Sequence, residues 1–498
     1  MIGKEYEDLR ELYEEITRLE QISCLLVWDQ NVYMPDGSIA SRAAQTSLVT
    51  GLIHQRYTSK RMGELLAKLD RKDLDDDQSV VVREISREYR RKTAVPEKLA
   101  KEISRTESEG YQIWVKAKQN DDFGSFASTF EKMVDLKKEV AEHIGYDDVP
   151  YDALLDGYEP YMRSKEVVSI FSDLRTRLVP LAERIADSGI TIDASPITGR
   201  FPKDKQIDLS NRILEDMGYD FNRGRLDETE HPFTIGSMDD TRITTRINED
   251  DIRTGLYACI HEGGHALYEM GYPEKNYCTP LAEPVSLGIH ESQSRFWENM
   301  VGRSLGFWER YLPEAKSMFP SLRGSSPIDL FKAANSVAPS LIRVEADEVT
   351  YNLHILIRFE IESEIFQDRL EVNEVPQAWN DKYSKYLGIE PENDSMGCLQ
   401  DVHWSIGYFG YFPTYTLGNL YSAMIREAMV TDLGDLDDLV RKGEMKKILA
   451  WLRERVHRHG KRYPAKELIR KVSGQELSAL PFIGYLKEKY SRVYDISL

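Results

Sequence analysis

Residues 256–270 read LYACIHEGGHALYEM, and this stretch decides the fold that we expect. Apolar side chains recur at helical spacing on both sides of its polar centre, which predicts a largely buried helix. The centre, from His261 to His265, has the pattern H-E-x-x-H. On a helix this spacing puts both imidazoles on one face, one turn apart, as two ligands of a single metal ion require. Glu262 between them is then placed to act as a general base toward an attacking water.

The alternative interpretation is an ordinary helix with two surface histidines. The apolar flanks argue against it, because buried imidazoles need polar partners. Gly263 and Gly264 also argue against it, since each costs a helix interior about 1 kcal/mol relative to alanine. Two glycines in the middle of a helix suggest close packing at the site. We therefore predict a metal site, and zinc is the metal that this motif favours.

A catalytic zinc ion takes a third protein ligand and keeps one position open. The sequence Glu283-Pro284-Val285-Ser286 is typical of a helix start, and the helix that follows carries Glu291. Glu291 is our candidate for the third ligand. His290, Glu298 and Glu283 are rivals, and spacing alone does not decide between them.

Helical periodicity dominates the rest of the chain, so we expect a mainly α protein. The clearest β signal is the stretch 231–248, where two runs rich in Thr and Ile flank the turn-prone residues 236–240. We predict a hairpin there, whose edge strand could pair with an extended peptide. No Ser/Gly-rich or Pro-rich spacer interrupts the chain, which favours one catalytic unit over residues 1–498.

The composition excludes several classes of partner. A net charge of -19 argues against nucleic acid and against anionic membrane surfaces, because both are bound by clustered Lys and Arg. The sequence has no apolar run approaching the ~20 residues that cross a bilayer. The charged start of the chain does not resemble a signal peptide. Four scattered cysteines fit a reducing compartment, so we expect a cytoplasmic protein.

Further motifs occur in a fixed order around H-E-x-x-H. They are His231-Pro232-Phe233, Asp240-Thr241-Arg242-Ile243-Thr244, His290-Glu291-Ser292-Gln293-Ser294-Arg295, Ile342-Arg343-Val344-Glu345-Ala346-Asp347 and Gly397-Cys398-Leu399-Gln400-Asp401-Val402-His403-Trp404. Together with H-E-x-x-H this set resembles the thermostable metallocarboxypeptidases of peptidase family M32. The resemblance extends over essentially the whole chain, because the region around Trp28-Asp29 and Met34-Pro35 also matches.

The resemblance implies a two-lobed helical fold with a deep groove. We expect an N-terminal helical lobe at 1–225, a core with the metal site and substrate groove at 226–420, and C-terminal helices at 421–498. It implies a homodimer that removes single residues from the C-termini of peptide substrates, with broad specificity except for proline. It also assigns the third metal ligand to Glu291, with zinc or cobalt as the metal.

Arg343 matches the carboxylate-binding arginine of that family. A planar guanidinium can donate two parallel hydrogen bonds to a free C-terminal carboxylate, which an exopeptidase must recognise. The alternative is a local salt bridge from Arg343 to Glu345 or Asp347.

The other candidate residues are expected to stabilise the tetrahedral intermediate or to line the substrate groove. His403, with Tyr411 or Tyr415, is expected to stabilise the oxyanion, although aromatic residues more often belong to a core. The expected groove residues, which contact substrate or orient the groups that do, are His231, Asp240, Arg242 and Gln400.

Two other functions remain open. A zinc endopeptidase or oligopeptidase would use the same metal chemistry but would need no carboxylate receptor, so Arg343 argues for the carboxypeptidase. A non-catalytic helical scaffold with a structural zinc would fill all four metal positions with protein ligands. Glu262 argues against the scaffold, because a structural site has no use for a general base.

Overall fold

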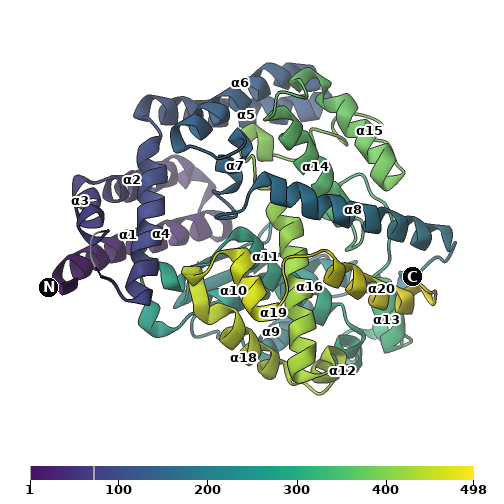
Figure 1. Cartoon of the computed structure of the whole chain (residues 1–498). Coiled ribbons are helices and arrows are strands. Elements are labelled where there is room, and N and C mark those ends of the chain that lie inside the picture. Colours follow the sequence, from purple (N-terminus) through teal and green to yellow (C-terminus); the bar gives the residue numbers. More distant parts are fainter. Residues whose placement is uncertain (1, 71–72) are drawn as a thin grey trace.

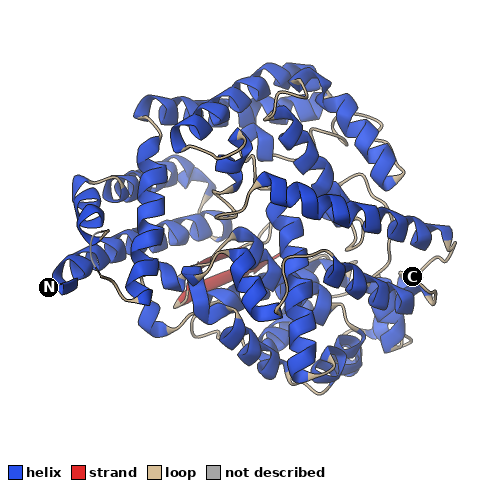
Figure 2. Ribbon diagram, viewed as in Figure 1, coloured by secondary structure: helices blue, strands red, loops and turns tan. Residues whose placement is uncertain are grey.

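The computed structural model describes residues 2–70 and 73–498, and almost all of its regular structure is helical (Figure 2). A single small sheet lies among the helices in this part of the chain. These observations confirm the prediction of a mainly α fold. None of the helices in the described ranges is both long and apolar enough to cross a bilayer.

The helices before the sheet form the part of the molecule that is coloured purple to blue in Figure 1. They are α1 (Ile2–Val32), α2 (Ile39–Tyr57), α3 (Lys60–Leu69), α4 (Asp76–Ala94), α5 (Glu97–Asn120), α6 (Phe123–Ile144), α7 (Pro150–Leu155), α8 (Ser164–Asp187) and α9 (Lys203–Met217). Their apolar faces follow the helical spacing expected from sequence.

The sheet contains β1 (Leu226–Glu228), β2 (Thr234–Ser237) and β3 (Asp240–Thr245) in the order β1-β3-β2. β2 and β3 are antiparallel, with Thr234 opposite Ile243, which confirms the predicted hairpin. The turn is shorter than expected, because Gly236 and Ser237 belong to β2. A Cβ atom on Gly236 would lie 1.9 Å from the carbonyl oxygen of Asp240, so only glycine permits this tight pairing.

The helices after the sheet complete the fold (Figure 1). They are α10 (Ile252–Glu269), α11 (Leu287–Arg295), the π-helix η5 (Phe296–Gly302), α12 (Leu305–Met318), α13 (Pro327–Ala334), α14 (Tyr351–Ile365), α15 (Val375–Leu387), α16 (Pro413–Leu433), α17 (Leu436–Arg441), α18 (Met445–Arg455), α19 (Ala465–Ser473) and α20 (Leu480–Tyr494). α11 packs against α10 and, more extensively, against α16.

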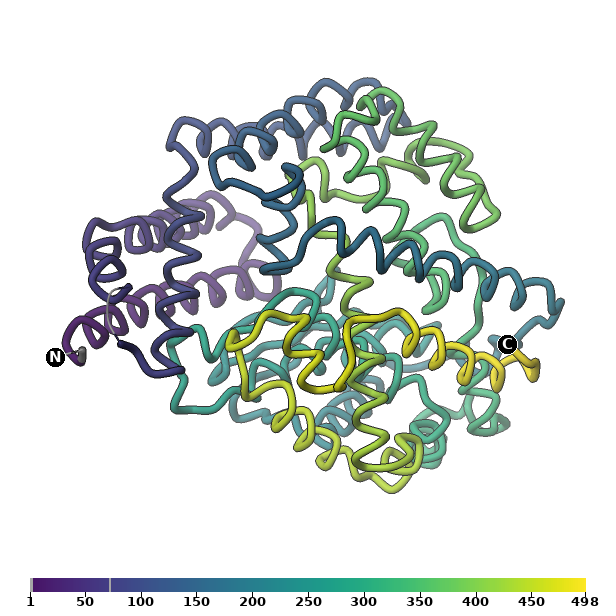
Figure 3. Tube along the Cα trace, in the orientation of Figure 1, coloured from purple at the N-terminus to yellow at the C-terminus, as the bar shows by residue number. Residues whose placement is uncertain are grey.

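Three apolar cores of the described residues stabilise these helices. The larger core extends from Ala117 to Tyr494, a smaller one joins residues from Tyr6 to Ile85 with Leu281, and the smallest contains Leu99, Ile103 and Leu136. The trace in Figure 3 shows the two chain ends on opposite sides of the molecule. The larger core crosses both proposed lobe boundaries, and the division at 225/226 and 420/421 stays a prediction.

Candidate metal and catalytic site

Helix α10 supplies the two histidines of the site. The side chain of Asp251 caps its N-terminus by accepting a hydrogen bond from the main-chain N–H of Arg253. The rings of His261 and His265 lie on one face with their centroids 4.9 Å apart. Glu262, between them, is buried and only 7% exposed.

Helix α11 brings Glu291 to these histidines. The Ser286 hydroxyl caps the helix by accepting from the N–H of Ile289 at 3.0 Å, so Glu291 lies just beyond the first turn. Its Oε2 atom lies 3.4 Å from Nε2 of His265 and 3.7 Å from Nε2 of His261. One ligand atom from each of these three residues lies within 4.8 Å of the others. The α10–α11 packing therefore forms a group of two imidazoles and one carboxylate.

Two arginines hold the carboxylates around this group. Arg295 donates to Oε1 of Glu291 at 2.7 Å, which leaves Oε2 facing the histidines. Glu298 contacts Nδ1 of His261 at 2.9 Å through Oε2, and its Oε1 accepts from Arg303 at 3.0 Å. Burial would raise the pKa of Glu291, but Arg295 and His261 outweigh it and hold the pKa well below its usual value.

The structure also separates Glu291 from its three rivals. Glu283 is paired with Lys461 and Tyr13. His290 contacts Glu269 through Nε2, although its ring stacks on His265 at 4.4 Å. Glu298 lies behind His261, where it orients the imidazole.

A divalent metal ion fits this group of side chains. Burial lowers the pKa of His265 to about 3, so its imidazole is neutral at pH 7, as a metal ligand must be. Two imidazole nitrogens and one carboxylate oxygen are a donor set that suits zinc, with room for a fourth ligand.

Glu262 has its own partner on the edge strand. The Oγ1 atom of Thr234 in β2 lies 2.6 Å from Oε2 of Glu262. The same hydroxyl lies 2.9 Å from the main-chain oxygen of Glu262. This contact joins the sheet to the middle of α10.

Arg343 lies in a short segment before α14 and is 6% exposed. Its Nε and Nη2 atoms donate to Oδ1 of Asp401 at 3.0 and 2.8 Å. Nη1 lies 3.2 Å from the hydroxyl of Tyr351. The ion pair is therefore with Asp401 and not with Glu345 or Asp347, the partners considered from sequence. Asp347 instead accepts hydrogen bonds from the main-chain N–H groups of Val349 and Thr350, just before α14.

Gln400 holds the backbone of the segment that carries Arg343. Its Oε1 accepts from the main-chain N–H of Arg343 at 2.9 Å and from Arg358 at 2.7 Å. Its amide nitrogen donates to the carbonyl of Leu341 at 3.0 Å. Both ends of the amide are thus used within the protein, and direct contact of Gln400 with substrate stays a prediction.

His403, Tyr411 and Tyr415 form one aromatic group beside Arg343. The ring of His403 lies 5.5 Å from that of Tyr411 and 6.5 Å from that of Tyr415. The Arg343 guanidinium lies 5.3 Å from the Tyr415 ring. Burial lowers the pKa of His403 to about 4 and raises the pKa of both tyrosines. At pH 7 all three side chains are neutral and can donate hydrogen bonds.

The remaining groove candidates lie on or near the hairpin. Asp240 and Arg242 form a two-bonded ion pair at 2.8 Å. The Arg242 guanidinium lies 4.1 Å from the ring of Trp28 in α1, so this pair connects the hairpin with the first helix. His231 is exposed in the loop before β2. A direct role in substrate binding for these residues stays a prediction.

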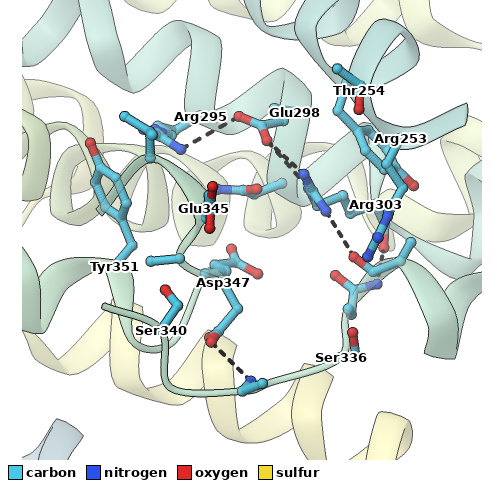
Figure 4. A pocket seen from close by; sticks show the side chains of 18 of the residues that line it. Arg253, Thr254, Arg295, Glu298, Arg303, Ser336, Ser340, Glu345, Asp347 and Tyr351 are labelled. Carbon is cyan, nitrogen blue, oxygen red and sulfur yellow. Dashed lines mark hydrogen bonds and ion pairs between the residues drawn. The ribbon is translucent and has the colours of Figure 1, made fainter. Parts of the chain in front are cut away.

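A cavity of about 670 Å³ adjoins the metal-site face of α10 (Figure 4). Thr254 and Tyr257 line it from the helix face that His261 continues, and Arg295 and Glu298 border it. In Figure 4 the loop bearing Ser336, Ser340 and Asp347 forms the opposite wall, with Tyr351 at one end. The cavity is connected to the metal site through Arg295 and Glu298, which contact Glu291 and His261.

Sequence reasoning missed the parts played by three residues. Thr234 follows His231-Pro232-Phe233 directly, but nothing in its spacing indicates contact with Glu262. Tyr351 lies 4.5 Å from the Arg295 guanidinium and so connects it with Arg343. Glu298 lies in the π-helix that continues α11, seven residues after Glu291, and this spacing of about two helical turns was the available signal.

A helical fold built around an H-E-x-x-H helix, with a carboxylate from a second helix completing the donor set, defines a metallopeptidase. The family model for Carboxypeptidase Taq (M32) metallopeptidase matches residues 8–490. The chain belongs to this family and is a metallocarboxypeptidase.

Its relatives match over nearly their full lengths. Thermostable carboxypeptidase 1 of Thermus thermophilus is 44% identical, over 98% of this chain and 99% of that protein. Carboxypeptidase 1 of Bacillus subtilis is 41% identical, over 97% of each chain. The crystal structure of the M32 carboxypeptidase from Deinococcus radiodurans R1 superposes with a TM-score of 0.97 at 37% identity, covering 99% of this chain and 100% of that one.

Proposed function

We propose that this enzyme removes single residues from the C-termini of peptides, with broad specificity except for proline, and that Arg343 receives the terminal carboxylate. The position of Arg343 carries the proposal. Asp401 occupies the Nε–Nη2 side of the guanidinium, while Nη1 faces Tyr351. Tyr351 in turn contacts Arg295, which holds Glu291. The Nη1 atom of Arg343 is therefore connected to Glu291 through two side chains, Tyr351 and Arg295.

His261, His265 and Glu291 are the proposed ligands of a zinc ion, and cobalt is a second candidate. When bound, the metal polarises the scissile carbonyl and makes the attacking water more acidic. Glu262 is the proposed general base, which accepts the proton of that water and returns it to the leaving amine. Its burial among the histidines supports this role.

His403 and a tyrosine are the proposed donors to the oxyanion. Support comes from their protonation, because neutral His403 and un-ionised Tyr411 and Tyr415 all carry a hydrogen to donate at pH 7. His231, Asp240, Arg242 and Gln400 are the proposed groove residues, acting on the substrate or on the groups that bind it.

We also propose a cytoplasmic homodimer, on the basis of the family resemblance and of the absence of any need for disulfides in a chain of this size. Light scattering in excess reductant measures the mass directly. A monomer at micromolar concentration would contradict the dimer.

The decisive experiment compares one peptide with a free and with an amidated C-terminus. A free peptide should shorten from its C-terminus one residue at a time, as a descending ladder in mass spectra. Amidation should block the reaction, because it leaves Arg343 with an uncharged partner in a buried site, at a cost of about 2–5 kcal/mol. Internal cleavage of both peptides at equal rates would favour the oligopeptidase instead.

Two variants sharpen this experiment. Arg343→Ala should depress kcat/KM for free peptides by a large factor and should retain the metal. Arg253→Ala is the control, because Arg253 is a second partly buried arginine whose ion pair, with Asp251, is separate from the pair of Arg343 with Asp401. The control should preserve the preference for free over amidated peptides.

A further inference from the structure

The hydroxyl of Thr234 is the hydrogen-bond partner of the Glu262 carboxylate among the described residues. The Oγ1–Oε2 distance is 2.6 Å, in the range of a hydroxyl bound to an ionised oxygen. Thr234 opens β2 and pairs with Ile243 of β3, so its backbone is held by the sheet. Its β-branched side chain has few rotamers, which fixes the hydroxyl in turn.

The kind of partner distinguishes Glu262 from the other two carboxylates of the site. Glu291 is held by Arg295, and Glu298 is held by Arg303. A cation beside a carboxylate stabilises its ionised form and therefore opposes its protonation. Glu262 is instead held by a neutral hydroxyl, which fixes its orientation without adding a positive charge.

The contact with Thr234 also distinguishes the two carboxylate oxygens of Glu262 from each other. The Thr234 hydroxyl lies closer to Oε2 of Glu262, at 2.6 Å, than to the main-chain oxygen, at 2.9 Å, so Oε2 is its acceptor and Oε1 is left to accept a proton. A glutamate side chain has three rotatable bonds and loses rotamer freedom when it is fixed. A contact from a rigid strand fixes the side chain when the protein folds, so this entropy is not lost again when the substrate binds.

We propose that Thr234 is a positioning residue, which holds the carboxylate of Glu262 in the orientation for proton transfer. The inference rests on the proposed role of Glu262 as general base. It assigns to the edge strand a task in the chemical step, in addition to any pairing with peptide.

The test compares Thr234→Val, which keeps the shape and removes the hydroxyl, with Thr234→Ser, which keeps the hydroxyl. A short peptide with a free C-terminus is the substrate, and metal content is measured in each sample. Thr234→Val should lower kcat by about 10- to 100-fold, the range expected for losing a hydrogen bond to a charged group. KM should change less than about twofold, and metal content should stay at the parental level. Thr234→Ser should recover most of kcat.

Thr245→Val is the matched control. Thr245 in β3 also donates from the sheet to α10, to the carbonyl of Gly255 at 3.2 Å, but it does not contact Glu262. Its kcat should remain within about threefold of the parent. An equal loss of kcat in Thr245→Val and Thr234→Val would indicate a general effect of loosening the sheet from the helix and would overturn the inference.

Glu262→Gln separates a failure of the inference from a failure of the proposed function. If Glu262→Gln stays within about tenfold of the parent, the assignment of the general base is wrong and the inference falls with it. If Glu262→Gln is inactive while Thr234→Val keeps kcat within about threefold, only the inference is wrong. Adding Thr234→Val to Glu262→Gln should lower kcat no further, since the hydroxyl acts through that carboxylate. A further large loss in the double variant would also overturn it.

Discussion

Gly264 of α10 lies directly against the backbone of Ser294 in α11. A Cβ atom on Gly264 would stand 2.7 Å from Cα of Ser294 and 2.7 Å from the carbonyl oxygen of Gln293. Neither backbone atom can move without shifting α11. This close approach is what allows Glu291 to reach His265, so the second glycine of the motif has a tertiary role.

Gly264→Ala should therefore separate the two helices. We expect a loss of about 1–3 kcal/mol in the free energy of unfolding, as for other overpacked sites, together with weaker metal retention. Gly263→Ala is the control, because its Cβ would meet only the ends of two flexible side chains, Leu214 and Met217. Thermal melts and metal analysis of both variants check this. A Gly264→Ala protein with parental stability and metal content would contradict it.

Removal of the metal should abolish activity. Chelation is expected to give an inactive protein, and zinc or cobalt should restore turnover, because His265 is neutral and Glu291 is anionic at pH 7, the states in which these side chains bind a metal. His265→Ala should lose the metal. His290→Ala should keep most of it, since His290 contacts Glu269 and only stacks on His265. Full activity in a verified metal-free sample would disprove the metal mechanism.

The buried carboxyl of Glu362 should make stability depend on pH. Burial raises its pKa to about 7, although Gly410, Tyr151 and Trp404 all donate to it. In the unfolded chain the pKa is near 4.5. The folded state thus keeps a proton that the unfolded chain loses between about pH 4.5 and 7, and the stabilisation from Glu362 declines as pH rises through this window.

The size of this effect is at most about 3 kcal/mol. The glutamine of Glu362→Gln cannot titrate. The free energy of unfolding of this variant should therefore decline less steeply between about pH 4.5 and 7 than that of the parent. Urea unfolding of parent and variant at several pH values between 4.5 and 7.5 measures the difference. Parallel curves for the two proteins would show that Glu362 does not carry the proton.

Features that depend on neighbours along the chain could be predicted from the sequence. The spacing of apolar residues predicts the helices, and the Thr- and Ile-rich runs predict the β2–β3 pair. H-E-x-x-H places two imidazoles on one face for the same reason, because a helix fixes the geometry of residues four apart. The ordered motifs were enough to predict the M32 family, which the family match confirms.

Contacts between residues from distant segments became known only from the packed structure. Spacing favoured Glu291 without excluding its rivals, and the contact of α10 with α11 distinguishes them. For Arg343 the neighbours in sequence suggested Glu345 or Asp347, but the ion pair forms with Asp401, 58 residues away. Thr234 and Glu262 meet because the sheet packs on α10. Such contacts depend on the packing of whole elements against one another, and a local pattern holds no information about that packing.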